Sequence, residues 1–221
     1  MSAKILYKFK AIDKFAFDIL LRKRVYLSDW GELNDPHEAQ MLIPDPVNQG
    51  FQFHANPRRL SKLSNNTLPI ENAEARICCF SQRWHRNLMW SHYADGHKGM
   101  AIGIELPESK GEFELIDVVY DDLVPRLEAP ITRDSVKQAL SHKSSEWHYE
   151  EEVRVLSFDP DARFVEGIRI HEIIFGSRAS REDKELVMRA LNQANTPVFK
   201  TCDKPGHYLL NKTDIRHEFG V

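Results

Sequence analysis

The chain has 221 residues and a formal net charge of −3, and 42% of its residues are hydrophobic while 29% are charged. This length fits one domain with a buried core, and the near-balanced charge provides no global basic field for nucleic acid, although local basic patches can still contact it. No apolar run approaches the roughly 18 residues of a membrane span, and no signal peptide is evident. The three cysteines form neither a disulfide framework nor a zinc spacing. We therefore expect a cytoplasmic protein without membrane contact.

The first predicted elements are a strand, a helix and a second strand. Residues 4–9 alternate as a strand, with Tyr7 and Lys8 on opposite sides. Apolar residues at helical spacing between residues 12 and 24 indicate a helix that ends in basic residues, where positive charge is favoured. Residues 25–28 form the second strand.

A polar turn and an irregular segment follow. The turn at Asn34, Asp35 and Glu38 is typical of an ordinary surface turn and equally of an active-site loop. The prolines and polar residues of about 44–75 predict an irregular insertion in the single domain, with one short helix around 57–63. A flexible cover over a cleft would have the same composition.

The stretch from Cys78 to Glu105 is the most informative part of the chain. It predicts a strand at 77–80, a helix at 87–94 capped by Asn87, and a buried strand at 99–104. Met89, Trp90, Tyr93 and Ala94 are expected to share one face of that helix. Plain core packing explains these aromatic residues, but rings with polar tips together with His92 and His97 also suit a binding cleft.

The C-terminal half predicts a regular mixture of elements. A strand is expected at 113–120, a helix at 134–146 capped by Asp134, and a strand from Tyr149 to Phe158. Further expected elements are a strand at 168–175, a helix from Ser180 to about Ala194, and short strands at 198–201, 208–210 and 215–219. These elements predict one α+β domain, residues 1–221, with a mixed, mostly antiparallel sheet that can be split and has flanking helices.

Three charged residues of the strand after Tyr149 are expected to lie on one face. Glu150, Glu152 and Arg154 alternate along it, on a side that becomes apolar two residues later. Three adjacent glutamates often serve only solubility. An ion pair at the mouth of a core is costly, however, and therefore points to a use.

Several familiar catalytic motifs are absent from the sequence. No P-loop, G-x-G-x-x-G, H-E-x-x-H or G-x-S-x-G occurs. Cys78, Cys79, His92 and His97 fit a metal site less well than they fit packing, so no metal is expected, and a buried cysteine is usually an inert thiol. The remaining pattern, two carboxylates near aromatic rings, suits cleavage of a glycosidic bond through an oxocarbenium-like state.

Five ordered motifs resemble a bacterial family of unknown function that often sits near phage-defence genes. They are Tyr7-Lys8-Phe9, Asn34-Asp35-Pro36-x-Glu38, Cys79-Phe80-Ser81, Met89-Trp90-Ser91-His92-Tyr93-Ala94-x-x-His97-x-Gly99 and Trp147-x-Tyr149-Glu150-x-Glu152-x-Arg154. The resemblance covers nearly the whole chain and implies no established activity. It leaves open a role in phage defence or as a toxin, with an unknown macromolecular target or neutralising partner.

The order of the motifs is also similar to that of ADP-ribosyltransferases, which implies an ADP-ribosyltransferase-like fold and NAD as substrate. By position, Lys8 corresponds to the first motif, Trp90 or Tyr93 to the ring that stacks on nicotinamide, and Glu152 of Glu150-x-Glu152 to the acid that holds the ribose 2-hydroxyl. Arg154 would orient the carboxylates. The remaining implied cleft residues are Tyr7, His92 and His97 near the cofactor and Asn34, Asp35, Glu38 and Ser81 on its wall. Lys8 departs from the Arg or His of that pattern, and lysine lacks the forked contact of arginine.

Two other classes of function stay open. Asp35, Glu38, Glu150 and Glu152 could hold a divalent ion in a metal-dependent nuclease. Alternatively, the aromatic cleft binds a nucleotide, or signals to a partner, without catalysis.

Overall fold

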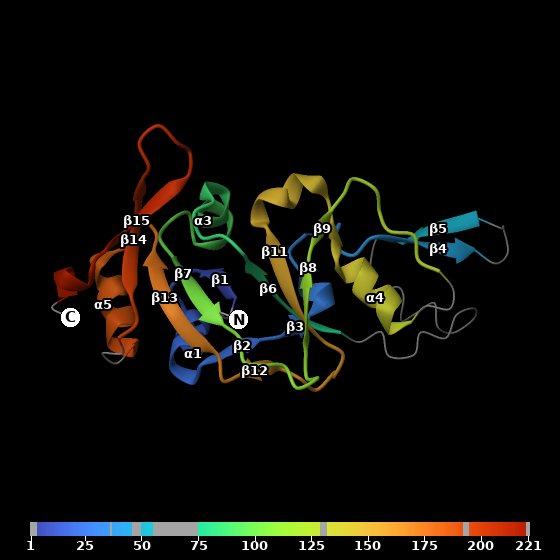
Figure 1. Cartoon of the computed structure of the whole chain (residues 1–221), viewed down its shortest axis with the longest axis horizontal. Helices are drawn as coiled ribbons and strands as arrows, with labels where there is room; N and C mark the ends of the chain where they lie inside the picture. The colour runs from blue at the N-terminus through green and yellow to red at the C-terminus, as the bar shows by residue number, and fades with distance from the viewer. Residues whose placement is uncertain are drawn as a thin grey trace.

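A mixed sheet forms the centre of the computed structural model, which describes residues 4–35, 37–45, 50–54, 75–128, 132–191 and 195–219. Its strands are β1 (Ile5–Lys10), β3 (Ser28–Asp29), β6 (Arg76–Ser81), β7 (Met100–Glu105), β8 (Glu114–Asp117), β11 (Glu152–Ser157), β13 (Arg169–Phe175), β14 (Val198–Asp203) and β15 (Leu210–Asp214). Within the described residues they follow the order β15-β14-β13-β7-β1-β6-β11-β8, with β3 beside β6 (Figure 1). The described pairs of this sheet are antiparallel except β13 with β14. The predicted α+β class with a mostly antiparallel sheet is confirmed.

The sheet is split between β1 and β6. β1 pairs with β7 along its whole length, from Ile5 opposite Glu105 to Lys10 opposite Met100. With β6 it shares the single pair of Tyr7 and Ser81, so the two strands separate beyond that point. The opening occurs in the middle of the sheet, where both strands have well-packed neighbours on their other sides.

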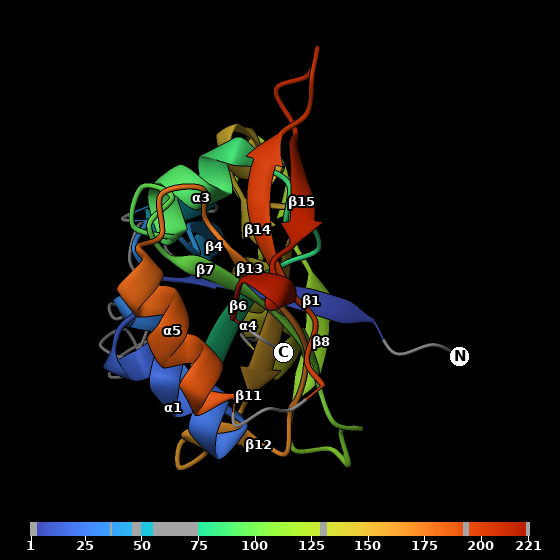
Figure 2. The ribbon, with the colours of Figure 1, turned by 90° about the vertical axis from the view of Figure 1, so that its left-hand side faces the viewer.

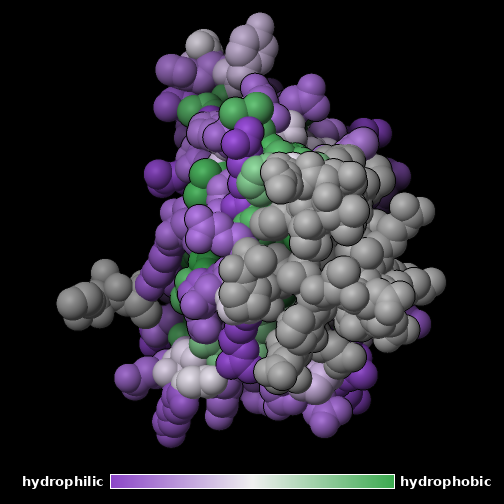
Figure 3. Space-filling view, turned by 90° about the vertical axis from the view of Figure 1, so that its right-hand side faces the viewer, coloured by the Kyte–Doolittle hydropathy of each residue, from purple (hydrophilic) through white to green (hydrophobic). Residues whose placement is uncertain are grey.

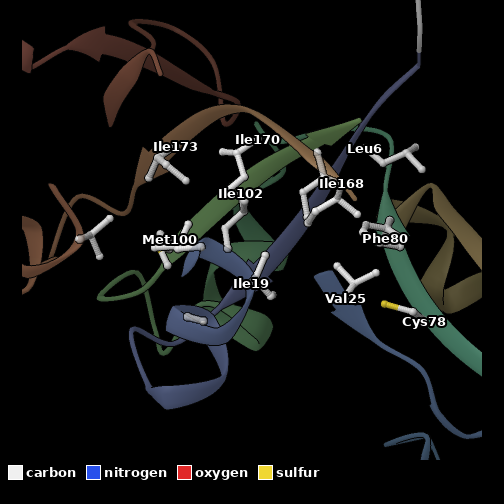
Figure 4. Packing of buried hydrophobic residues seen from close by; sticks show 14 of the residues in the cluster. Leu6, Ile19, Val25, Cys78, Phe80, Met100, Ile102, Ile168, Ile170 and Ile173 are labelled. Carbon is white, nitrogen blue, oxygen red and sulfur yellow. The ribbon is translucent and has the colours of Figure 1, made fainter. Parts of the chain in front are cut away.

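Two helices, α1 (Lys14–Arg22) and α5 (Arg181–Ala190), lie side by side on one face of the sheet (Figure 2). The Asp13 carboxylate accepts hydrogen bonds from the first amides of α1, and Ser180 caps α5 as predicted. Beneath them lies the largest hydrophobic core, in which Ile19 of α1 joins Ile102 and Phe80 of the sheet (Figure 4). This packing covers one side of the split.

The remaining elements complete two smaller cores. They are β2 (Arg24–Tyr26) paired with β12 (Phe164–Glu166), β4 (Met41–Asp45) with β5 (Gly50–His54), β9 (Val119–Tyr120) in parallel with β10 (His142–Lys143), helices α3 (Asn87–Tyr93) and α4 (Arg133–Leu140), and 3-10 helices η1 (Trp30–Glu32), η3 (Ser145–Glu150) and η4 (Arg216–Phe219). One core packs α4 against β8 and β11, and the other packs α3 against β1, β7 and β13. On the face shown in Figure 3 the described residues are mostly hydrophilic, with a narrow strip of hydrophobic side chains.

Several predicted boundaries were wrong in the first half of the chain. Residues 25–28 contribute to two short strands, β2 and β3, instead of one. Asn87 is the first residue of α3, and the preceding Arg86 makes no side-chain capping bond. The predicted insertion at 44–75 contains the end of β4 and all of β5, while the expected helix at 57–63 lies outside the described residues.

Boundaries also differ in the second half. The strand predicted at 113–120 is interrupted at Val118, because β9 leaves β8 to pair with β10. Thr132 caps α4 in a capping box with Ser135, and the helix ends at Leu140 because the following residues join that pairing. Residues 215–219, predicted as a possible last strand, form the 3-10 helix η4 instead.

The strand expected from Tyr149 begins only at Glu152. Ser145–Glu150 forms the 3-10 helix η3, which begins after Ser144 and ends at Glu151, whose φ of 42° is left-handed. Tyr149 and Glu150, predicted as the first strand residues, therefore belong to the 3-10 helix instead. Among the described residues, no helix has both the length and the apolar character to cross a membrane.

Candidate functional site

A cavity of about 840 Å³ opens where β1 and β6 separate. Lys8 and Lys10 of β1 line it on one side and Cys79 and Phe80 of β6 on the other. Further wall residues come from elements far apart in the sequence: Asn34, Glu38, His92, Tyr93, Glu150 and Glu152. The volume lies within the range of about 300–1,000 Å³ that small-molecule sites usually have. The split in the sheet therefore creates a site of ligand size.

Lys8 bridges the opening between the two strands. Its ammonium donates a hydrogen bond of 2.8 Å to the backbone carbonyl of Cys79 and lies 5.5 Å from the centre of the Phe80 ring. The carbonyl would have been paired with β1 if the sheet had stayed closed. Because an ammonium carries three donors, Lys8 keeps donors for a ligand.

Glu150 and Glu152 reach the cavity because the residue between them turns the backbone. The left-handed Glu151 directs its own carboxylate away, to ion pairs with Arg83 and Arg86. Ser81 holds the segment in place, since its hydroxyl donates to the Glu150 carbonyl at 2.6 Å. The two carboxylates on either side of Glu151 thus point to the same interior space.

The centre of that space is Lys143, a residue that sequence analysis did not identify. Its Nζ lies 2.7 Å from Glu150 Oε2, 3.4 Å from Glu152 Oε2 and 3.7 Å from Glu38 Oε2. The Trp147 ring covers this ammonium, with its centre 4.8 Å from Nζ. Lys143 comes from β10, so the pairing of β9 with β10 delivers the cation to the three acids.

Arg154 holds two of the same carboxylates from behind. Its Nε donates to Glu152 Oε1 at 2.8 Å and its Nη2 to Glu152 Oε2 at 3.0 Å, while Nη2 also lies 2.5 Å from Glu38 Oε1. The guanidinium is fully buried and its Nη1 donates to the Leu140 carbonyl. The ion pair expected on the row of Glu150, Glu152 and Arg154 therefore forms, between Glu152 and Arg154 and in forked geometry.

The charges of this buried cluster do not balance. Three carboxylates, Glu38, Glu150 and Glu152, face the two cations Lys143 and Arg154, and each of these five side chains is at most 6% exposed. One negative charge is in excess among these five groups, and Lys8 on the neighbouring wall, whose charge acts on Glu152 without an ion pair, offsets part of it. Since an uncompensated buried charge is costly, the cluster favours either one bound proton or a positively charged ligand.

The two neighbouring acids differ in proton affinity. Burial raises the pKa of Glu150 above its ordinary value, although Lys143 and Tyr93 oppose the change. Burial acts in the same direction on Glu152, but Arg154 and then Lys143 outweigh it and hold the pKa of Glu152 at about 2. Burial likewise raises the pKa of Glu38 against the pull of Arg154 and Lys143. Glu152 is therefore the permanent carboxylate, and the exchangeable proton belongs to Glu150 or Glu38.

Tyr93 is the aromatic residue that the structure brings to these acids. Its hydroxyl donates to Glu150 Oε1 at 2.6 Å and accepts from Asn34 Nδ2 at 3.3 Å. Burial and the bond to Glu150 raise the pKa of this hydroxyl, which keeps it protonated. His92, one residue earlier, also lines the cavity, and its Nδ1 lies 3.0 Å from the Tyr149 hydroxyl.

Other predicted site residues lie elsewhere. Trp90 is fully buried between α3 and the sheet, donates to the Trp84 carbonyl and does not line the cavity. His97 stacks on the far side of Trp90, and its Nε2 lies 3.2 Å from the Ser91 hydroxyl. Tyr7 lines the cavity, but its hydroxyl donates a hydrogen bond to Glu172 and not to the acid cluster. Asp35 closes its own turn by accepting from the His37 amide.

Cys79, one of the two cysteines of the cavity wall, is unsuited to nucleophilic attack. Burial, with Glu152 nearby, raises the pKa of Cys79 well above its ordinary value. The thiol therefore stays protonated, in agreement with its interpretation as a packing residue.

A second residue that sequence analysis missed supports the start of β11. The Tyr120 hydroxyl accepts a hydrogen bond of 2.8 Å from the Glu152 amide. The strand partner that would normally satisfy this amide is replaced by a side chain from β9. Tyr120 therefore helps to fix the direction of the Glu152 side chain.

Comparison with known proteins gives one match. A family model described as a protein of unknown function (DUF2971) matches residues 89–155, less than a third of the chain. The matched segment runs from α3 into β11 and contains Tyr93, Lys143, Glu150, Glu152 and Arg154. No curated protein matches the chain, and no solved structure does. The similarity is thus to a family without a known activity, and it includes most of the charged cluster.

Proposed function

We propose that the chain is an NAD-dependent glycosyl-transfer enzyme with chemistry like that of ADP-ribosyltransferases. The observation that supports this most is the convergence of Tyr93, Glu150 and Glu152 on the inner end of one ligand-sized cavity, where three carboxylates form ion pairs with only two cations. NAD presents a positively charged pyridinium ring at its reactive glycosidic bond. A cluster with more carboxylates than directly paired cations is complementary to this group and to the oxocarbenium-like charge that forms when the bond breaks.

Glu152 would stabilise that charge. The bond between the ribose carbon and the nicotinamide nitrogen breaks, and its electron pair leaves with nicotinamide, which becomes neutral. Glu152 Oε1 accepts from Arg154 Nε and has a further lone pair for the ribose 2-hydroxyl. Arg154 acts through Glu152 as a positioning residue, because it holds that carboxylate ionised and in one orientation.

Glu150 would manage the proton of the acceptor. The attacking nucleophile, water or a hydroxyl, carboxyl or amine of a target, forms the new bond to the ribose carbon and loses a proton if it carries one. Glu150, whose pKa is raised by burial, can take that proton when it is ionised. The Tyr93 ring, next to Glu150 in the cavity, supplies the apolar surface for nicotinamide in place of the buried Trp90.

The nuclease hypothesis has a weaker basis. Three of its four acids meet, but the ammonium of Lys143 stands among them, where a divalent ion would have to sit. Asp35, the fourth, bonds to its own turn. A metal would have to displace an internal cation that is itself well paired.

Binding without turnover remains the second candidate, and one observation favours it. Both oxygens of Glu152 are already engaged by Arg154, and one also lies near Lys143. Such pairing also suits an acid whose role is structural. In that case NAD or a nucleotide would raise the melting temperature while no nicotinamide appeared.

Measurement of nicotinamide released from NAD tests the proposal. We expect release by the wild-type chain and a loss of at least about 100-fold in Glu152→Gln, the size of effect seen when one charge-stabilising group is removed. Glu151→Gln is the matched control, since the neighbouring carboxylate points away from the cavity. Release that is unchanged in Glu152→Gln would contradict the proposal. The role in phage defence and the nature of the target stay predictions.

A further inference from the structure

The cavity continues along β1 to an outer end that has a different character from the acid cluster. Lys10 follows Lys8 on the same face of β1. Glu152 is paired with Ser81, which is itself opposite Tyr7, and Lys10 lies three residues or about 10 Å farther along β1 than Tyr7. The first turn of α1 then brings Lys14 and Phe15 to the same wall. The site is therefore acidic at one end and basic at the other.

Exposed aromatic rings accompany these lysines. Phe15 is 58% exposed and Tyr26 of β2 is 50% exposed, and both line the cavity. The Nζ atoms of Lys10 and Lys14 lie 5.6 Å and 5.0 Å from the centre of the Phe15 ring. An apolar ring left open at the mouth of a cavity and flanked by two cations is a surface suited to a flat, anionic ligand.

Neither Lys10 nor Lys14 forms an ion pair among the described residues, although the charge of Asp13 acts on Lys10. In the described part of the chain, Arg24 of the same wall forms ion pairs with Asp18 and Glu166, whereas Lys10 and Lys14 lie within ion-pair distance of no carboxylate. Burial and the positive charge of Lys8 lower the pKa of Lys10, so the two ammonium groups on β1 repel each other. A phosphate next to Lys10 would relieve this repulsion.

We propose that this outer end, formed by Lys10, Lys14, Phe15 and Tyr26, is a subsite for a nucleotide, whose base stacks on Phe15 while its phosphates pair with Lys10 and Lys14. The inference rests on the proposed function and deepens it. It assigns the adenosine diphosphate half of NAD to the basic end and leaves the nicotinamide riboside half at Glu152. The free nucleotide is favoured over a nucleic-acid strand because the lysines are few and belong to the wall of a cavity of about 840 Å³.

Calorimetric titration with ADP tests the subsite directly. We expect wild-type binding that weakens as salt is added, and a loss of affinity of about 10-fold or more in Phe15→Ala and in Lys14→Gln. Phe15→Trp should restore binding because it restores the stacking surface. Leu21→Ala is the matched control, as Leu21 is 62% exposed on the same helix and does not line the cavity. Equal ADP affinity in Phe15→Ala and wild type would overturn the proposal.

Two further arms separate this inference from the proposed function and from nucleic-acid binding. ADP should bind Glu152→Gln as tightly as wild type, so ADP binding without nicotinamide release would reject the activity and support the subsite. A single-stranded oligonucleotide of ten nucleotides should fail to displace ADP. If the oligonucleotide binds through Phe15 and Lys14 while ADP does not bind, the free-nucleotide assignment is wrong.

Discussion

The Nζ of Lys143 lies 2.7 Å from Oε2 of Glu150, in an ion pair whose two side chains are 4% and 5% exposed. Burial alone would lower the pKa of this lysine, but Glu152, Glu38 and Glu150 together raise it. The lysine is therefore charged, and it is the cation that allows three acids to lie together in the interior. Its position links the stability of the fold to the geometry of the site.

Replacement of Lys143 by methionine should destabilise the protein severely. Three buried carboxylates would then face Arg154 alone, and loss of one partner from a buried pair typically costs about 3–5 kcal/mol. Lys137→Met is the control, because the exposed pair of Lys137 with Glu114 is worth at most about 1 kcal/mol. Urea denaturation measures the free energy of unfolding of both variants. Equal losses of this free energy in the two would contradict the internal role of Lys143.

Acid should destabilise the protein through Glu152. Its pKa is about 2 in the folded chain and 4.5 ordinarily, so the unfolded chain binds the extra proton between these values. Stability from this group is present above pH 4.5 and is lost as pH falls toward 2, by up to about 3 kcal/mol. The free energy of unfolding, measured from pH 2 to 6, should fall less steeply in Glu152→Gln than in wild type. Parallel curves would show that Glu152 is not held ionised.

The left-handed backbone at Glu151 makes a prediction that is independent of charge. Glu151→Asn and Glu151→Val both remove the ion pairs with Arg83 and Arg86, but only asparagine tolerates a φ of 42° readily. The valine variant should be less stable than the asparagine variant by about 1–2 kcal/mol. Thermal and urea unfolding of the pair decide the matter. A difference near zero would mean that the turn between Glu150 and Glu152 is not enforced.

The rate of nicotinamide release should rise with pH as Glu150 loses its proton. Because burial raises the pKa of Glu150, the pH at which the rate increases should lie above 4.5, the ordinary pKa of glutamate. Tyr93→Phe removes a hydrogen bond that lowers this pKa, so its profile should move to higher pH, and Glu150→Gln should abolish the rise. A wild-type profile that is flat above pH 4.5 would remove Glu150 from the role of base.

Much of the fold could be predicted because periodicity reports local structure. The alternation of β1 and the apolar runs of β6 and β7 predict these three strands, and the structure confirms them. Of the predicted caps, Ser180 is confirmed, whereas that of α4 is wrong, since Thr132 and Asp134 are both good caps and only the course of the backbone selects one. Helical spacing also placed Met89, Trp90 and Tyr93 on one face. All three side chains contribute to the same hydrophobic core, and Met89 and Tyr93 also line the cavity, whereas Trp90 does not.

The site could be predicted only in part, for a related reason. Glu150, Glu152 and Arg154 carry a signal because a charged row runs into an apolar strand. Lys143 carries almost none, as it lies in a polar stretch between α4 and η3 that resembles a solvated loop. Its burial depends on β10 pairing with β9, a contact between residues about 23 positions apart. Pairing of this kind is a tertiary event that residue types alone do not specify.

The most direct test of the central claim is a crystal structure of the chain with a non-hydrolysable NAD analogue. The account predicts the ribose 2-hydroxyl at hydrogen-bond distance from Glu152, the nicotinamide ring against Tyr93 and the adenosine phosphates near Lys10 and Lys14. An analogue bound outside the opening between β1 and β6, or bound there without contact to Glu152, would contradict it.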